Sequence, residues 1–142
     1  MTAMKRIHLD PPELPDWSGH FSQVVVAEGS RLRIVAVSGQ VGVDAQQRIC
    51  GDGSLEAQLD GAFRNLQVAL SAAGCSAADV VKITIYVVGY TPEKAGAIQE
   101  AVRRHLGDPP LPACSLVGVQ ALARPEFQVE VEALAITEGS GS

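Results

Sequence analysis

Two glutamates near the end of the chain are the first residues whose type and spacing could do chemistry. Glu130 and Glu132 alternate with valines, so on a strand both carboxylates point to the same face of a sheet. A carboxylate in a cleft can hold a water molecule or transfer a proton to a substrate. The same side chains could instead form a solvated edge or bind Lys82 or Arg33, and the spacing leaves both interpretations open.

Three cysteines, Cys50, Cys75 and Cys114, are the other residues with reactive side chains. Their number is odd and no two are close together, which argues against a disulfide framework and against a C-x-x-C metal site. We therefore expect no metal ion, and no motif indicates an organic cofactor. A reducing compartment, the cytoplasm, is the natural location for such a chain.

Size and charge limit the possible partners. The chain has 142 residues, the size of a single domain spanning 1–142, and its hydrophobic fraction of 46% is enough to form a core. The net charge of −5 argues against a nucleic-acid groove, and the adjacent Arg103 and Arg104 fit a solvated helix face. No apolar run approaches the length of a membrane span, so we expect neither a membrane partner nor a signal peptide.

The elements that would position these residues begin with an extended segment. Residues 1–19 contain three prolines and are expected to form extended or irregular chain docked on the domain. Residues 22–27 are rich in valine, and residues 31–38 alternate apolar with polar positions. The two segments flank a turn at residues 28–30, which indicates a β-hairpin.

Apolar residues at helical spacing predict a helix over residues 55–73. Ser54 is placed to cap its first turn and Gly74 to end it. A strand dense in β-branched residues follows at residues 80–88. The polar face of the helix fits ordinary solvated surface and is formed by Glu56, Gln58, Asp60, Arg64 and Gln67.

The rest of the chain adds a second helix and two further strands. The helix starts at Thr91, whose hydroxyl is expected to cap it, and ends before Gly107. Strands are expected at about residues 113–120 and 127–136. Residues 138–142 form a small polar tail that is expected to be frayed and flexible.

The resulting order, β-β-α-β-α-β-β, predicts an α+β fold with a mixed sheet. Each helix joins two strands and must cross over the sheet, so both helices should cover the same face under the right-handed rule. The other face carries some apolar residues and would be left bare. We therefore expect the sheet to pack against other copies of the same chain.

Five segments of the chain match a known family pattern in order and spacing. They are Ser38-Gly39-Gln40-Val41, Ala72-Ala73-Gly74, Asp79-Val80-Val81-Lys82, the stretch from Leu111 to Val119, and Glu130-Val131-Glu132-Ala133. Together they resemble the RidA/YjgF/L-PSP family over most of the chain, from about residue 22 to residue 136. The resemblance implies a chorismate-mutase-like protomer, a homotrimer, and clefts between subunits that bind small molecules.

The resemblance also implies roles for individual residues. Glu130 matches a glutamate that positions or activates the water attacking an imine carbon. Gly39 matches a glycine whose backbone lies against the ligand. Phe21 falls where many members have a tyrosine, Gln99 falls near an asparagine of the second helix, and Leu116 falls at another position that lines the pocket.

Cys114 departs from the family pattern. In the imine deaminases of the family this position is an arginine that binds the substrate carboxylate, a task suited to a bidentate guanidinium. Cysteine is neutral at pH 7 unless a cation lowers its pKa. A carboxylate desolvated against it would lack a partner, so the usual amino-acid-derived imines should be poor substrates.

Three interpretations of Cys114 remain open. It could be a small buried residue, a neutral contact for a substrate without a carboxylate, or a nucleophilic thiol with His20 as its base. Arg124, in the turn before the last strand, could supply a substitute guanidinium or could be an exposed turn residue.

The sequence thus favours a RidA-type trimer outside the arginine-bearing deaminases. As an enzyme it would be a hydrolase-like protein that uses activated water on an imine or enamine, with Glu130 handling water or a proton. The alternative is a non-catalytic ligand-binding or regulatory trimer, because loss of the arginine fits this equally well. An endoribonuclease is less favoured, because the chain is acidic and shows no histidine pair or metal cluster.

Overall fold

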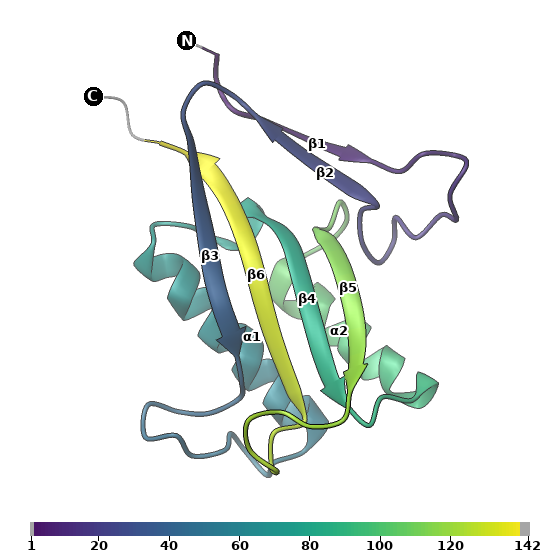
Figure 1. The fold of residues 1–142 in the computed structure, drawn as a ribbon, viewed down its shortest axis with the longest axis vertical. Helices are drawn as coiled ribbons and strands as arrows, with labels where there is room; N and C mark the ends of the chain where they lie inside the picture. The colour runs from purple at the N-terminus through teal and green to yellow at the C-terminus, as the bar shows by residue number, and fades with distance from the viewer. Residues whose placement is uncertain (1, 140–142) are drawn as a thin grey trace.

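A four-stranded mixed sheet forms the centre of the computed structural model, which describes residues 2–139. The strand order is β3-β6-β4-β5, where β3 is Leu32–Gln40, β4 is Val80–Val88, β5 is Ala113–Val119 and β6 is Val129–Glu138. Strands β4 and β5 are parallel, and the other neighbours are antiparallel. The strands β3 and β5 therefore form the two edges of the sheet (Figure 1).

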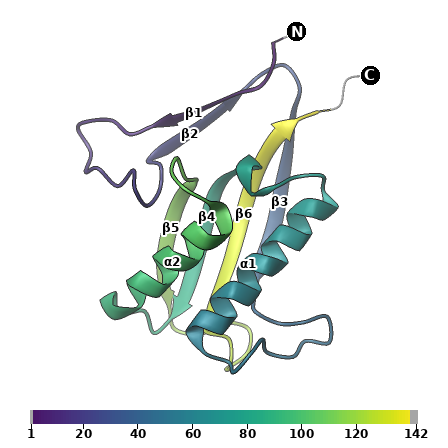
Figure 2. The same cartoon turned by 180° about the vertical axis from the view of Figure 1, so that it is seen from behind.

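Two helices, α1 (Leu55–Ala72) and α2 (Ala95–Leu106), cover one face of this sheet, as expected, and leave the other face bare (Figures 1 and 2). The side chain of Ser54 accepts a hydrogen bond from the backbone N–H of Ala57, and Gly74 has a φ of 74°. Both ends of α1 therefore form where the sequence predicted them.

Short 3-10 helices precede β4 and α2, at Ala77–Asp79 and Pro92–Lys94. The second helix thus begins with one tight turn rather than with a regular α-helical one. The hydroxyl of Thr91 makes no capping bond to the backbone, so the expected side-chain cap was wrong. None of the helices within residues 2–139 is long and apolar enough to cross a membrane.

The core lies between the sheet and the two helices. Leu59, Phe63 and Leu66 of α1 are fully buried against it. On β6 the valines are buried and the intervening glutamates are partly exposed. This alternation directs Glu130 and Glu132 to the bare face of the sheet, the same face for both, as the sequence indicated.

The N-terminal region differs from the expectation. Residues 1–19 include a strand, β1 (Lys5–Leu9), which pairs antiparallel with β2 (Val24–Glu28) in a separate two-stranded sheet. The expected hairpin between residues 22–27 and 31–38 was wrong, because β3 pairs with β6 instead. The turn after β2 therefore connects two sheets rather than two paired strands.

The end of the chain is also more ordered than expected where it is described. Glu138 is the last residue of β6 and pairs with Leu32, and its carboxylate accepts a hydrogen bond from the backbone N–H of Met4 at 3.0 Å. The N–H of Gly139 donates to the carbonyl of Arg31 at 2.7 Å. The rest of the predicted tail, residues 140–142, lies outside the described residues.

The polar face of α1 is not ordinary solvated surface throughout. Gln58 is only 1% exposed. Its amide group donates to the carbonyls of Gly53 and Glu126, at 3.1 and 2.9 Å, and its carbonyl oxygen accepts from the backbone N–H of Gln128 at 2.9 Å. Gln58 therefore ties the start of α1 to the segment that leads into β6.

Asp60, on the same helix, joins α1 to α2. Its carboxylate accepts from the guanidinium of Arg104 and is hydrogen-bonded to the imidazole of His105, both at 2.8 Å. The His105 ring also stacks on Phe63 with 5.4 Å between the centroids. His105 is thus structural, as expected, but through Asp60 and Phe63 rather than through the helix dipole alone.

Candidate functional site

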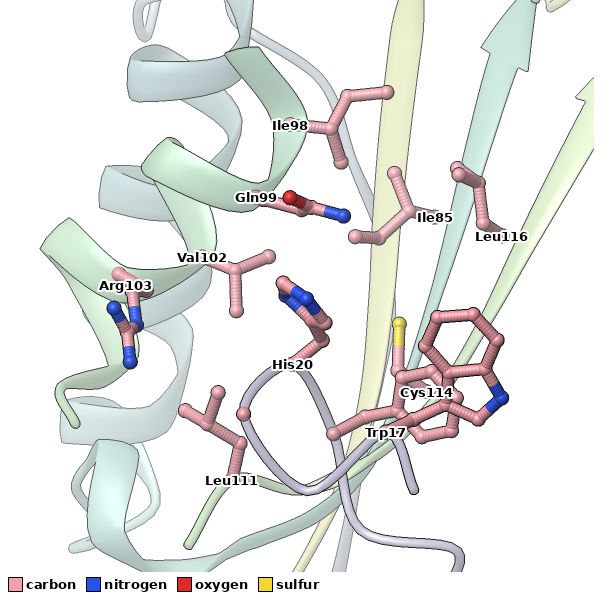
Figure 3. A pocket seen from close by; sticks show the side chains of 12 residues that line it. Trp17, His20, Ile85, Ile98, Gln99, Val102, Arg103, Leu111, Cys114 and Leu116 are labelled. Atoms are coloured by element: carbon pink, nitrogen blue, oxygen red, sulfur yellow. The ribbon is translucent and has the colours of Figure 1, made fainter. Parts of the chain in front are cut away.

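A pocket of about 220 Å³ opens beside the edge strand β5 (Figure 3). Three parts of the fold form its walls: the loop between β1 and β2, the helix α2, and the strands β4 and β5 with the segment that leads into β5. The lining residues are Trp17, Gly19, His20, Phe21, Ile85, Ile98, Gln99, Val102, Arg103, Leu111, Cys114 and Leu116.

Ser22 holds the loop onto the start of β5. Its hydroxyl donates a hydrogen bond to the carbonyl of Leu111 at 2.6 Å and is also hydrogen-bonded to Nδ1 of His8 at 2.7 Å. Its backbone N–H donates to the carbonyl of Pro112 at 3.2 Å. Because Ser22 is buried, these bonds are shielded from water, and they fix Phe21 against the strand segment that carries Cys114.

The loop itself presents aromatic rings to the pocket. Trp17 stacks on Phe21 with 6.4 Å between centroids and 22° between the planes. The ring of His20 lies 6.5 Å from that of Trp17 and tilted by 49°. Sequence reasoning missed Trp17, although the only tryptophan of the chain stands just before the glycine of this loop.

Five of the residues singled out in the sequence meet in this pocket. Phe21 and His20 come from the loop, Gln99 comes from α2, and Cys114 and Leu116 come from β5. Alternate residues of an edge strand share a face, which explains why Cys114 and Leu116 line the same side. The loop and the strand are about ninety residues apart in the chain, so only the fold brings them together.

Cys114 is held as a protonated thiol. Burial raises the pKa of the Cys114 thiol to about 11, and the positive charge of Lys82 opposes this effect only in part. A thiol with this pKa is almost entirely neutral at pH 7. No hydrogen bond joins it to His20 in the described part of the chain. The environment therefore supports a neutral lining residue rather than a nucleophile.

Glu130 and Gly39 lie beside each other but outside this pocket. Strand β3 carries a bulge between Val37 and Gln40, and bulges commonly redirect side chains near functional sites. A Cβ atom at Gly39 would lie 2.6 Å from Cδ of Glu130. The Glu130 carboxyl group thus rests on the bare backbone of Gly39.

The two clusters face opposite sides of the sheet. Cys114 pairs with Ile83, which is buried under the helices. Glu130 pairs with Tyr86, whose side chain belongs to the bare face. Within one protomer the sheet therefore separates Glu130 and Gly39 from the pocket that holds Cys114.

Glu132 has a partner of its own on the bare face. The hydroxyl of Tyr86 donates a hydrogen bond to its carboxylate. This bond, followed by burial and the nearby negative charges, raises the pKa of Tyr86 above its ordinary value. Lys82 donates instead to the hydroxyl of Ser115 at 2.7 Å, and Arg33 donates to the carbonyl of Ala73 at 2.9 Å.

Two arginines bear on the question of a substitute guanidinium. Arg124 lies outside the pocket, where it pairs with Glu126, donates to the carbonyl of Gln47 at 3.2 Å and lies over the ring of Phe127. Arg103, assigned to a solvated helix face from the sequence, is exposed as expected and also lines the pocket. A signal was available, since Arg103 follows Gln99 by one helical turn. Among residues 2–139, no three His, Cys, Asp or Glu side chains are placed to hold a metal ion.

Two helices on one face of a small mixed sheet define an α+β fold, and a pocket opens at its edge strand. A family model described as Endoribonuclease L-PSP matches residues 13–137. A 2-iminobutanoate/2-iminopropanoate deaminase from Dermatophagoides farinae is 29% identical over 94% of this chain and 98% of its own. The chain therefore belongs to the RidA/YjgF/L-PSP family, as its sequence indicated.

Solved structures agree with this assignment. YyfB from Yersinia pestis, described as a protein of unknown function of the conserved Rid family, is 35% identical with a TM-score of 0.81, and the match covers 92% of this chain and 97% of that one. RidA from the Antarctic bacterium Psychrobacter sp. PAMC 21119 is 27% identical with a TM-score of 0.64, over 91% of this chain and 98% of its own. The fold is therefore that of the Rid proteins.

Proposed function

We propose that the protein acts as a homotrimer whose clefts between subunits bind a small metabolite and hydrolyse or tautomerise an imine or enamine. The observation that supports this proposal is that the expected site residues lie on two opposite faces of the sheet within one protomer. Cys114, Phe21 and Gln99 line one pocket, whereas Glu130 rests on Gly39 on the opposite face of the sheet. A complete site would then need the pocket of one copy and the Glu130 carboxylate of another.

The proposed chemistry is the addition of water to a C=N bond. Glu130 accepts a hydrogen bond from a water molecule and takes its proton as the oxygen bonds to the imine carbon. The electron pair of the C=N bond moves to nitrogen, which receives that proton. The hydroxyl proton then passes to the nitrogen through Glu130 as the C–N bond breaks, which releases the amine or ammonia and leaves a carbonyl. The name of the relative from Dermatophagoides farinae, an imine deaminase, supports this class of reaction.

Cys114 restricts the substrate. A buried thiol with a pKa of about 11 carries no charge at neutral pH and offers no bidentate partner to a carboxylate. An α-carboxylate placed there would be desolvated without compensation. We therefore expect short 2-imino acids, whose carboxylate is attached to the reacting carbon, to be poor substrates.

The test is an imine hydrolysis assay in which an amino-acid oxidase generates 2-iminopropionate in situ. The wild type should show little or no acceleration over the spontaneous reaction. Cys114→Arg should gain activity, and adding Glu130→Gln to that variant should remove the gain. Cys114→Ser is the matched control, because it changes the side chain without adding a cation, and it should stay inactive.

Strong hydrolysis of 2-iminopropionate by the wild type would contradict the argument from the missing guanidinium. A panel of imines and enamines without an α-carboxylate then tests the chemistry itself. Turnover that is sensitive to Glu130→Gln is expected. If no member of the panel is turned over although ligands bind, the protein is a non-catalytic ligand-binding trimer instead.

A further inference from the structure

Arg103 and Arg104 are adjacent in the chain but differ in their surroundings. The Arg104 guanidinium donates to Asp60 at 2.8 Å and lies 3.6 Å from the Glu100 carboxylate. The Arg103 side chain forms no hydrogen bond or ion pair with any residue from 2 to 139, and it lines the pocket. Arg103 thus brings a permanent positive charge to the pocket, and no carboxylate neutralises it there.

Helix α2 gives the pocket an apolar wall and a polar edge. Ile98 and Val102 are buried where they meet the sheet and also line the pocket. Gln99 and Arg103 are one turn apart and so lie along the same side of the helix. Figure 3 shows Arg103 at the outer margin beside Val102, with Cys114 and Trp17 on the opposite side of the pocket.

The opposite side suits an apolar and planar group. The rings of Trp17 and Phe21 are stacked there, and Cys114 adds a neutral thiol. Aromatic faces bind flat groups by stacking. An apolar cavity of roughly 150 Å³ holds a benzene molecule, so a pocket of about 220 Å³ has room for a ring and a short chain.

We propose that the pocket binds ligands with an apolar, planar body and an anionic group at the far end, and that the Arg103 guanidinium binds this anion. Such a ligand would lie in the opposite orientation to one bound by an arginine at position 114. Its apolar end lies at Cys114 and its anionic group lies at the margin of the pocket. Arg103 is a specificity-determining residue in this arrangement. The inference rests on the proposed function, since it assigns the ligand class of the same pocket.

The experiment measures binding of two matched probes, 3-phenylpropanoate and its neutral amide, 3-phenylpropanamide. Trp17 is the only tryptophan and lines the pocket, so its fluorescence reports occupancy. The wild type should bind the acid about tenfold more tightly than the amide, because a charge-assisted bond to Arg103 is available only to the acid. Pyruvate, whose carboxylate has no apolar body, should bind weakly.

Arg103→Gln should bind the acid and the amide with equal affinity. The matched control is Arg64→Gln, which removes the same charge from the exposed side of α1. Within residues 2–139, Arg64 donates only to the carbonyl of Asp60. This control should keep the preference for the acid. Circular dichroism of each variant verifies that the fold is retained.

Equal binding of acid and amide by the wild type would overturn the proposal, as would binding of neither probe. A preference for the acid that survives in Arg103→Gln would also overturn it. These outcomes are separate from failure of the proposed function, because probe binding requires no turnover. A protein that prefers the acid through Arg103 and yet hydrolyses no imine would retain this ligand class and lose only the proposed chemistry.

Discussion

At the scale of single residues, the environment of Cys114 matters as much as its identity. The side chain lies at the start of β5 under the aromatic loop, and burial raises the pKa of its thiol to about 11. At pH 7.5 the thiolate is then a fraction of roughly one in a few thousand. The pocket therefore ends in a neutral and weakly polar group where the deaminases of the family carry a cation.

The raised pKa predicts slow alkylation of Cys114. In the native protein at pH 7.5, iodoacetamide should modify Cys114 about a hundredfold more slowly than in the urea-unfolded protein, because a thiol of ordinary pKa forms far more thiolate. Peptide mapping by mass spectrometry resolves Cys114 from the other two cysteines. Equal rates in the folded and unfolded protein would show that the thiol is activated after all.

The sequence supplied part of this pocket and missed the rest for a physical reason. Cys114 could be placed by resemblance because it lies in a matching segment, and Phe21 and Gln99 because they fall at or near aromatic and amide positions of the family. Trp17 and Arg103 could not, since the resemblance assigns neither a role and a charged residue beside Arg104 fits solvated surface equally well. The position of Arg103 one helical turn after Gln99 was the one indication that it lies near the pocket. That indication can be used only once the loop between β1 and β2 is known to form the facing wall.

At the scale of elements, local sequence patterns predicted which segments form helices and strands. They failed to predict which strands pair with each other. The periodicity of residues 55–73 and the caps of that helix are local properties, and α1 forms there. The pairing of β3 with β6 joins residues about a hundred positions apart, and no local pattern encodes it. A short turn between two β-rich segments therefore resembled a hairpin, whereas β2 pairs with β1.

Gln58 shows how α1 supports the strand β6, which carries Glu130. The change Gln58→Leu keeps the size of the side chain but leaves the carbonyl of Glu126 and the N–H of Gln128 without their bonds. Both bonds are partly buried, and a polar group that loses its partner away from water costs about 1–3 kcal/mol. We expect the free energy of unfolding, measured in urea, to fall by about 2–4 kcal/mol, and Glu130, two residues after Gln128, to lose its fixed position.

The control for this prediction is the same substitution at Gln67, nine residues later on α1. In Gln67→Leu a single side-chain bond is lost, to the carbonyl of His105 at 3.1 Å. It should cost about 1 kcal/mol or less. Both variants are compared at one protein concentration, because the proposed self-association would contribute to apparent stability. Equal losses for the two variants would mean that Gln58 does not hold the β6 segment in place.

The contact between α1 and α2 should depend on pH through Asp60. The hydrogen bond from His105, with a further contribution from Arg104, lowers the pKa of Asp60. A lowered folded-state pKa stabilises the fold above the ordinary carboxyl pKa of about 4, and this stabilisation is lost as the pH falls through the lower folded value. Because the side chain is 39% exposed, solvent keeps the effect at about 1 kcal/mol or less.

The measurement compares the unfolding free energies of the wild type and Asp60→Asn at pH 6 and at pH 3. The difference between them should be present at pH 6 and smaller at pH 3. Glu100→Gln, which removes the more distant and more exposed partner of Arg104, should match the wild type at both values. A difference for Asp60→Asn that does not change with pH would show that its pairing to α2 is not electrostatic.

At the scale of the whole molecule, the bare face of the sheet requires an explanation. Ile34 pairs with Ile136, and Ala36 pairs with Leu134, so the four side chains form one apolar patch on the face that no helix covers. The same face carries Glu130 on Gly39. A homotrimer packed through this face would bury the patch and would bring Glu130 close to a second copy, which is what a shared site requires.

Two exposed aliphatic residues allow this proposal to be tested with a matched pair. Ile34 and Val68 are both 69% exposed in the protomer, but Ile34 lies on the bare sheet face and Val68 lies on α1. Light scattering after size exclusion should give the mass of three protomers of 14.9 kDa for the wild type and for Val68→Asp. Ile34→Asp should give smaller species, because a carboxylate buried in an apolar contact lacks a partner. Trimers that persist in Ile34→Asp and dissociate in Val68→Asp would move the interface to the helices and would separate Glu130 from any shared site.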